Sequence, residues 1–210
     1  MSEHDLNWKY VDEAVNEPAT IQAARQVSLE LGVTPVSPGV GAQLAVLAAA
    51  HRAKSIVEIG TGVGVSGLWL LSAVPHATLT TIDADADMHQ HARGQFTAAG
   101  ITTARARLIT DRAATVLPRM NEQSYDLVFI DADADSIIEY VEHALRLAKV
   151  GGVVVVARAL ATGRVADPAR RDEATVTMRG LIDDLAQSPA VATAITPVGD
   201  GLLQIVKLAE

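Results

Sequence analysis

The feature that most constrains the fold is a regular alternation of short apolar segments with longer amphipathic ones through the middle of the chain. The short segments predict strands at 55–59, 78–83, 107–110, 125–130 and 153–157. The segments between them predict helices at 65–74, 85–99 and 137–147. Strands that alternate with helices form a right-handed, doubly wound parallel sheet. The strand predicted at 153–157 reads VVVVA, an apolar β-branched run that is typical of a central parallel strand.

The amino-terminal residues 1–50 do not follow this alternation and predict a helical extension. Pro18 is placed to start one helix and Gly32 to end it. The Ser37-Pro38 pair then opens a second helix, with the serine as the capping residue. We therefore expect helices ahead of a cofactor-binding core at 51–210, in a single domain over 1–210.

The carboxyl-terminal part predicts a long polar helix followed by a β-hairpin. Asp167-Pro168 is expected to cap the helix, which reaches about Gln187. Segments 191–198 and 202–208 flank a glycine-containing turn and predict an antiparallel pair. The fold class is therefore α/β, a Rossmann-like, mostly parallel seven-stranded sheet with an antiparallel hairpin at one edge.

Composition excludes several classes of function. There are 17 Lys and Arg against 25 Asp and Glu, a net charge of −8, which disfavours a nucleic acid as partner. The absence of cysteine removes disulfide scaffolds and thiolate metal sites. The polar, acidic amino terminus is not a secretory signal, and the apolar stretches are too short to cross a bilayer. We expect a cytoplasmic protein with no membrane partner.

A glycine-rich segment, VEIGTGVGVS at 57–66, stands between a predicted strand and a predicted helix. Glycines let the backbone turn sharply and approach a ligand, and the start of the following helix offers unpaired N–H groups. Asp83 ends the next predicted strand, where a carboxylate can bind the two hydroxyls of a ribose. The segment therefore predicts a nucleotide-containing cofactor.

Two cofactors fit the glycine pattern. Gly62, Gly64 and Gly67 spell GxGxxG, the fingerprint of a dinucleotide site and hence of a nicotinamide oxidoreductase. However, Glu58 lies within the preceding strand, where its charge would repel a pyrophosphate. A cofactor with a cationic sulfonium and a free amino group tolerates that acid. This favours S-adenosylmethionine and leaves the nicotinamide cofactor as an alternative.

At this point the chain resembles the S-adenosylmethionine-dependent O-methyltransferases of the caffeoyl-CoA and catechol type. The resemblance covers about 34–207 and rests on six motifs in order: SPGVGAQL (37–44), VEIGTGVGVSGLWL (57–70), TTIDAD (80–85), YDLVFIDADA (125–134), ATGRVADP (161–168) and PVGDGLLQIVK (197–207). It implies a class I methyltransferase fold, a small-molecule hydroxyl acceptor and a homodimer. The acceptor pocket is expected from the amino-terminal helices and the loop after Ala157.

The resemblance also implies a set of cofactor-binding residues. Those expected near the methionine part are Val36, Glu58, Gly60, Thr61, Gly62 and Ser66. Asp83 is expected at the ribose, and Arg112 and Ala113 beside the adenine, where TDRA at 110–113 departs from the family's usual Gly-Asp-Ala. Asp133 is expected close to the cofactor. Two plainer alternatives stay open: Ser66 serves only as a helix cap, and Asp133 only as the N-cap of the next helix.

The sequence departs from this family at the metal site. The family holds a divalent cation with the first Asp of the acidic motif, here Asp131, and with an Asp-Asn pair after the fifth strand. That pair is replaced by Ala157 and Arg158, and the family's usual lysine is Ala134. An alanine supplies no ligand, and a guanidinium only donates hydrogen bonds. We therefore expect no metal.

Two catalytic hypotheses follow from this departure. In the first, Arg158 replaces the metal as the counter-charge of Asp131, so that both residues act in a metal-independent methyl transfer to the acceptor. In the second, the chain is a catalytically impaired protein of the same fold that binds the cofactor without turnover.

Overall fold

The computed structural model describes residues 3–209 and contains a seven-stranded sheet of order β3-β2-β1-β4-β5-β7-β6. The strands are β1 (Ser55–Ile59), β2 (Thr78–Asp83), β3 (Ala106–Thr110), β4 (Tyr125–Ile130), β5 (Ala148–Val156), β6 (Val191–Thr196) and β7 (Leu202–Lys207). Strands β1 to β5 all run parallel to one another, whereas β7 runs antiparallel to both β5 and β6. The predicted fold class is confirmed.

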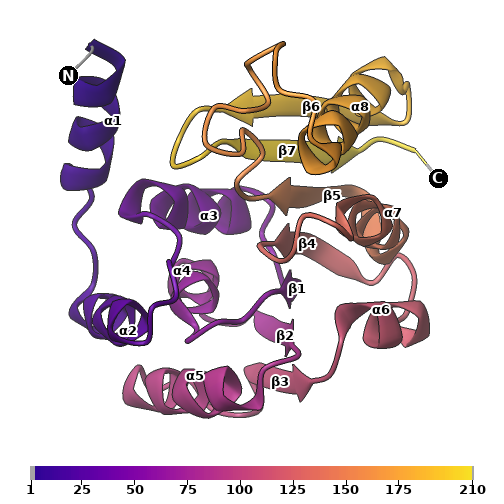
Figure 1. The fold of residues 1–210 in the computed structure, drawn as a ribbon. Helices are drawn as coiled ribbons and strands as arrows, with labels where there is room; N and C mark the ends of the chain where they lie inside the picture. Colours follow the sequence, from indigo (N-terminus) through magenta and orange to yellow (C-terminus); the bar gives the residue numbers. More distant parts are fainter. Residues whose placement is uncertain (1–2, 210) are drawn as a thin grey trace.

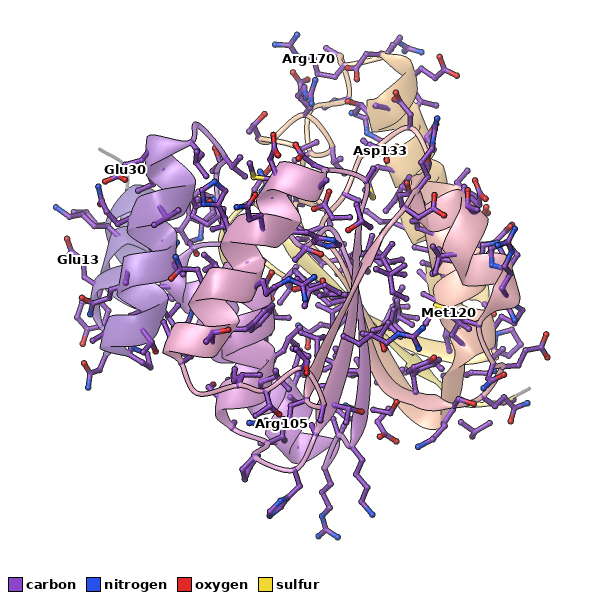
Figure 2. The ribbon with its side chains drawn as sticks, turned by 90° about the horizontal axis from the view of Figure 1, so that it is seen from below. Glu13, Glu30, Arg105, Met120, Asp133 and Arg170 are labelled. Atoms are coloured by element: carbon purple, nitrogen blue, oxygen red, sulfur yellow. The ribbon has the colours of Figure 1, made fainter. Side chains whose placement is uncertain are left out.

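Helices cover both faces of the sheet, as seen in Figure 1 and, with the sheet edge-on, in Figure 2. One side carries α2 (Ala19–Glu30), α3 (Pro38–Ala50), α4 (Val65–Ser72) and α5 (Ala86–Ala98). The other side carries α6 (Ala113–Val116), the 3-10 helix η1 (Leu117–Arg119), α7 (Ile137–Leu147) and α8 (Glu173–Gln187). The amino-terminal α1 (Glu3–Glu13) lies beside α3 at the edge of the first group.

Strand alternation divides the apolar core between these two faces. Along β4, Leu127 and Phe129 belong to the cluster under α2–α5, whereas Val128 and Ile130 belong to the cluster under α6–α8. All four side chains are at most 1% exposed. Successive side chains of a strand point to opposite faces, so a strand that is apolar throughout must be covered on both. The apolar strand pattern in the sequence therefore already required the doubly wound architecture.

The start of the last helix is the clearest error of the sequence analysis. Asp167-Pro168 does not cap it; α8 begins at Glu173, and Asp172 is its N-cap, with Oδ1 accepting a hydrogen bond from Thr175 N. The preceding residues form turns that Arg179 holds from within the helix. Its guanidinium donates to the carbonyl oxygens of Val165, Arg170, Arg164 and Asp167. A tertiary contact from one arginine thus overrides a local start signal.

Two smaller differences concern elements that the sequence analysis did not resolve. The fifth strand begins at Ala148 rather than at 153, with an irregularity in its pairing to β4 between Tyr125 and Leu127. Helix α1 was not predicted; Asp12 near its end accepts a hydrogen bond from Gly39 N at 2.8 Å, which ties it to α3. Within residues 3–209, no helix has the length and apolarity needed to cross a membrane.

Candidate functional site

The polar residues of the site gather at the carboxyl ends of the parallel strands. The loop after β1, Asp83 at the end of β2 and Asp131 after β4 line two adjoining cavities. The first cavity, about 260 Å³, lies between the glycine loop and residues 33–37, which we call the strap. The second cavity, about 460 Å³, lies between β2, β4 and the start of α6. Ligands of open α/β sheets bind at this edge. Asp133 marks this end of the sheet in Figure 2, and Arg105 lies at the opposite end.

The glycine loop passes directly over the end of β4. A Cβ on Gly60 would lie 2.0 Å from the carbonyl oxygen of Asp131, and its φ of +93° is also one that side chains rarely adopt. Gly64, with φ of +94°, is the N-cap of α4. Only glycine allows the loop to run this close to the neighbouring strand and then turn into the helix. The first turn of α4 consequently faces the first cavity.

Asp83 stands between the two cavities and holds the loop in place. Its Oδ2 accepts hydrogen bonds from Thr61 N and Gly62 N, both at 2.9 Å, and its Oδ1 accepts one from Asp85 N at 3.0 Å. The carboxylate lines both cavities. It therefore has a structural task beside the ribose contact expected from the sequence.

Glu58 lies behind the loop and lines neither cavity. Its side chain is fully buried, Oε2 accepts a hydrogen bond from Thr81 Oγ1 at 2.6 Å, and Oε1 has no partner among the described residues. Burial raises its pKa from 4.5 to about 7, although the hydroxyls of Ser66 and Thr81 oppose the rise. The structure thus separates Glu58 from Gly60, Thr61, Gly62, Ser66 and Val36, which do line the first cavity.

A buried chain of hydrogen bonds connects Glu58 to the edge of the sheet. From Thr81, the chain continues to Thr61 Oγ1 at 2.6 Å, then to His89 Nε2 at 2.9 Å, and from His89 Nδ1 to Thr110 Oγ1 at 2.7 Å. When Glu58 is ionised, Thr81 donates to it and each hydroxyl in turn accepts from the next group, which places the proton of His89 on Nε2. Burial lowers the pKa of His89 and favours this neutral ring.

His89 is the residue that the sequence analysis missed. The candidate site residues of the sequence analysis do not include it. A signal was nevertheless present: His89, Ala92 and Phe96 share the buried face of α5, at spacings of three and four residues. A histidine on an otherwise apolar helix face must find partners, and here the partner is Thr61 of the glycine loop.

The second cavity contains the residues expected near the adenine. Arg112 and Ala113, at the start of α6, line it opposite Asp133 and Tyr140. Asp133 Oδ2 accepts a hydrogen bond from the Tyr140 hydroxyl at 2.7 Å, and Oδ1 accepts one from Ser136 N at 3.0 Å. Although burial raises the pKa of Asp133, these bonds bring it below its usual value. Asp133 therefore holds the turn ahead of α7, but the N-cap of this helix is Ser136, so the N-cap alternative for Asp133 is wrong. The N-cap of α4 is Gly64, so Ser66 is not the cap of that helix either.

Arg158 and Asp131 form an ion pair at the position where the resemblance implies a metal site. Arg158 Nε lies 2.7 Å from Asp131 Oδ1, and Nη2 lies 3.4 Å from Oδ2. Nη2 also donates to the carbonyl oxygen of Thr34 in the strap at 2.8 Å. The residue reaches this position with φ of +58°, an unfavourable conformation for a side-chain-bearing residue.

A third cavity of about 180 Å³ lies on the other side of this ion pair. It is lined by the strap, the residues around Arg158, Val40 and the turn before β7. Thr34, Pro35, Val36 and Arg158 line both the first and the third cavity. The acceptor region expected from the amino-terminal helices and the loop after Ala157 therefore adjoins the glycine-loop cavity.

The side chains at this position do not fit a divalent cation. Both oxygens of Asp131 face the guanidinium of Arg158, and Ala157 offers no ligand. A cation here would have to displace a positive charge already in contact with its one carboxylate. Across residues 3–209, no group of three or more His, Asp or Glu side chains is placed to hold a metal ion.

Comparisons with known proteins agree with this geometry. Residues 12–208 match the O-methyltransferase family. A protein of Mycobacterium avium (strain 104) whose name places it among O-methyltransferases is 43% identical over 199 residues, which are 94% of this chain and 90% of that protein. The structure of a Corynebacterium glutamicum protein gives a TM-score of 0.91 at 28% identity, covering 100% of this chain and 99% of that one.

A further solved structure relates the fold to a cofactor. TomG of Streptomyces achromogenes, an O-methyltransferase involved in tomaymycin synthesis, was crystallised in complex with S-adenosylmethionine. It is 29% identical with a TM-score of 0.87, and each chain is covered completely. The family match decides between the two cofactors that the glycine pattern left open. The chain belongs to the O-methyltransferase family, the S-adenosylmethionine-dependent methyltransferases that its motifs resemble.

Proposed function

We propose that this chain transfers the methyl group of S-adenosylmethionine to a hydroxyl of a small molecule without a metal ion. The observation that carries the proposal is the Arg158–Asp131 ion pair, which stands between the first and third cavities and occupies the family's metal position. The cofactor site and the acceptor site are then neighbours that share the strap as a common wall.

The cofactor is assigned to the two larger cavities. Its methionine part lies in the first cavity, beside Thr61, Ser66 and the strap, and its adenosine part lies in the second, beside Arg112 and Ala113. Asp83 lies at the junction, where a carboxylate oxygen accepts hydrogen bonds from ribose hydroxyls. Glu58 acts on the cofactor only through its charge behind the loop.

Methyl transfer needs alignment and exclusion of water more than covalent chemistry from the protein. When bound, the cofactor supplies a methyl group on a sulfonium. The strap and Val40 supply an apolar wall that excludes water from the acceptor. Asp131 and Arg158 orient the acceptor oxygen. The negative charge of Asp131 and the positive charge of Arg158 neutralise each other. Both side chains therefore stay ionised in a partly buried site without a metal ion.

The alternative is that the chain binds the cofactor without turnover. Ala134 stands where the family has a lysine, so the described site lacks that ammonium group. Turnover with a panel of phenols separates the two functions: methylated product from any of them supports the enzyme. Saturable cofactor binding with no product from the panel supports the binding protein.

We also propose that the protein is a cytoplasmic homodimer. The support is the apolar surface of α1, where Leu6, Trp8, Tyr10 and Val11 are exposed, together with the prevalence of closed two-fold dimers among soluble oligomers. Light scattering at micromolar concentration tests the assembly. A mass close to the 22.0 kDa of one chain contradicts it.

Cofactor binding is tested first, with S-adenosylhomocysteine as the probe. The probe should raise the melting temperature, whereas NADH, magnesium and a chelator should each leave it unchanged. Asp83→Ala should weaken binding by about 1.5–3 kcal/mol, the usual range for hydrogen bonds to a charged group. Because Asp83 also holds Thr61 N and Gly62 N, the variant should lose stability as well. Undiminished affinity contradicts the ribose assignment.

A further inference from the structure

The cavities on either side of Arg158 contain little that can remove a proton. Among the described residues that line the first and third cavities there is no histidine, lysine or tyrosine. These are the side chains, besides carboxylates, that most often act as general bases. The titratable groups that remain are Arg158 and four carboxylates.

Each of those four carboxylates already accepts hydrogen bonds from the protein. Asp131 accepts from Arg158, and Asp83 accepts from the glycine loop. Asp85 caps α5, and both oxygens of Asp200 lie within hydrogen-bonding distance of Thr162 N. Each carboxylate is therefore already engaged in holding the backbone or the Arg158 guanidinium in place. None of the four is placed as a free base for an acceptor.

Arg158, in contrast, keeps a donor group that its protein contacts do not use. Nε and Nη2 face Asp131, and Nη2 also donates to Thr34 O. Nη1 donates to no acceptor within residues 3–209. In the fixed fork of a guanidinium, Nη1 is not part of the Nε–Nη2 edge that faces Asp131. The side chain is 49% exposed and lines both the first and the third cavity.

We propose that the acceptor enters as an oxyanion, an already ionised phenol or enol, whose oxygen binds Nη1 of Arg158. This inference rests on the proposed function and names the acceptor class for the same site. A third cavity of about 180 Å³, walled by Pro35, Val36, Val40 and Ala157, accepts one ring, since a dry cavity of about 150 Å³ binds benzene.

The chemistry balances without a base in the protein. A lone pair of the acceptor oxyanion forms the new O–C bond, the C–S bond breaks, and its electron pair goes to sulfur. The products are a neutral methyl ether and a neutral thioether. A neutral hydroxyl would leave a proton on the new ether oxygen, and no free base lines the cavities to take it. The acidic acceptor loses that proton to solvent before it binds.

The test uses 4-nitrophenol, whose ionisation is visible in its absorbance, bound to the complex of the protein with S-adenosylhomocysteine. The phenolate should bind at least about tenfold more tightly than the phenol, because an opposite charge at contact distance shifts a pKa by about one unit or more. The apparent pKa of bound nitrophenol should fall accordingly. Arg158→Gln should abolish this shift and Arg158→Lys should retain part of it.

Arg170→Gln is the matched control. It removes one positive charge from the same loop, but Arg170 is exposed, lines none of the three cavities and lies at the outer surface in Figure 2. The fall in the apparent pKa of bound nitrophenol should therefore persist in Arg170→Gln. A second measurement needs no variant: for a series of substituted phenols, the midpoint of the pH–rate profile should follow the pKa of each phenol.

The outcomes separate this inference from the proposed function. If S-adenosylhomocysteine binds but the complex prefers the neutral phenol, binds both forms equally or binds neither, the acceptor class is wrong and the cofactor assignment stands. A midpoint that stays fixed across the phenol series indicates a base in the protein and also overturns the inference. Failure to bind S-adenosylhomocysteine contradicts the proposed function itself.

Discussion

The two sides of the site are held by different kinds of interaction. The side that we assign to the cofactor, called the cofactor side, consists of strand ends and a glycine loop. Short hydrogen bonds among Glu58, Thr81, Thr61 and His89, inaccessible to water, tie it together. The side that we assign to the acceptor, called the acceptor side, consists of the strap and the loop after β5, tied by half-exposed contacts such as Arg158 to Thr34 O.

Backbone conformation differs in the same way. On the cofactor side the residues with positive φ are Gly60, Gly62 and Gly64, whereas the acceptor-side loop contains the non-glycine residues Arg158, Ala161 and Thr162 at φ of +58°, +47° and +55°. Such residues cost roughly 1–2 kcal/mol each and persist only when the surroundings hold them. The sheet therefore fixes the cofactor side, and side chains fix the acceptor side, where the sequence also departs from its family.

The largest expected effect comes from Gly60→Ala, which should destabilise the protein by at least about 3 kcal/mol or prevent folding, since the new Cβ meets Asp131 O at 2.0 Å. Gly163→Ala on the acceptor side is the matched change. Its φ of +81° is similar, but nothing lies within 4 Å of the added Cβ, so about 1–2 kcal/mol is expected. Chemical denaturation measures the free energy of unfolding of both variants. Equal losses of stability would remove the contrast between the two sides.

The second prediction concerns the pH dependence of stability through Glu58. Burial raises its pKa from 4.5 in the unfolded chain to about 7, with Asp131 and Asp83 adding to the rise. The folded state then binds the proton more tightly, so this contribution is complete below pH 4.5 and is lost as the pH rises through about 7. The loss is about 3 kcal/mol on the scale of 1.36 kcal/mol per pKa unit.

Glu58→Gln should remove that dependence and make the protein more stable than wild type at pH 8. The free energy of unfolding, measured from pH 4 to pH 8 in both proteins, gives the difference. The neutral His89 contributes an opposite slope on the acid side, and it cancels in this comparison because both proteins contain it. Parallel curves for the two proteins contradict the assignment to Glu58.

The third prediction tests whether the buried chain positions the loop. His89→Leu should cost about 1–3 kcal/mol by leaving Thr61 and Thr110 without their partner, and should weaken S-adenosylhomocysteine binding. His89→Gln can restore the bond to Thr61 and should recover much of the affinity. Exposed His91→Leu on the same helix should change stability by less than about 0.5 kcal/mol. If His89→Leu loses stability but binds S-adenosylhomocysteine as tightly as wild type, His89 does not position the glycine loop.

The smallest effect on stability is expected on the acceptor side. Arg158→Ala should cost about 1 kcal/mol, because Arg158 is half-exposed and ion pairs screened by solvent contribute little. Hydrogen exchange should nevertheless speed up in the strap around Thr34, whose carbonyl oxygen loses its bond to Arg158. Arg164→Ala, an exposed arginine of the same loop, should leave this exchange unchanged. A loss above about 3 kcal/mol would show that the acceptor side is as rigidly built as the cofactor side.

Residue patterns of short range were enough to predict most of the fold. Strands of apolar β-branched residues, the Ser37 cap and the turn before β7 are each decided within a few neighbouring residues, and the structure contains all of them, with only the start of β5 misplaced. The start of α8 was not placed correctly, because Arg179 holds the segment ahead of it from a distance. Of the candidate site residues, the sequence analysis expects Glu58 beside the cofactor, which stays a prediction; in the structure its side chain is buried next to Thr81 and lines neither the first nor the second cavity.

The sequence by itself determined the doubly wound sheet and the glycine loop, because periodicity and residue chemistry are local properties. Only the tertiary structure decided that Arg158 joins Asp131 to the strap, and that His89 meets Thr61 behind the loop. Arg158 and Thr34 are 124 positions apart, and their contact exists only once the strand ends and the first helices are packed together. Such long-range contacts carry no periodic signal, and they set the chemistry of the acceptor side.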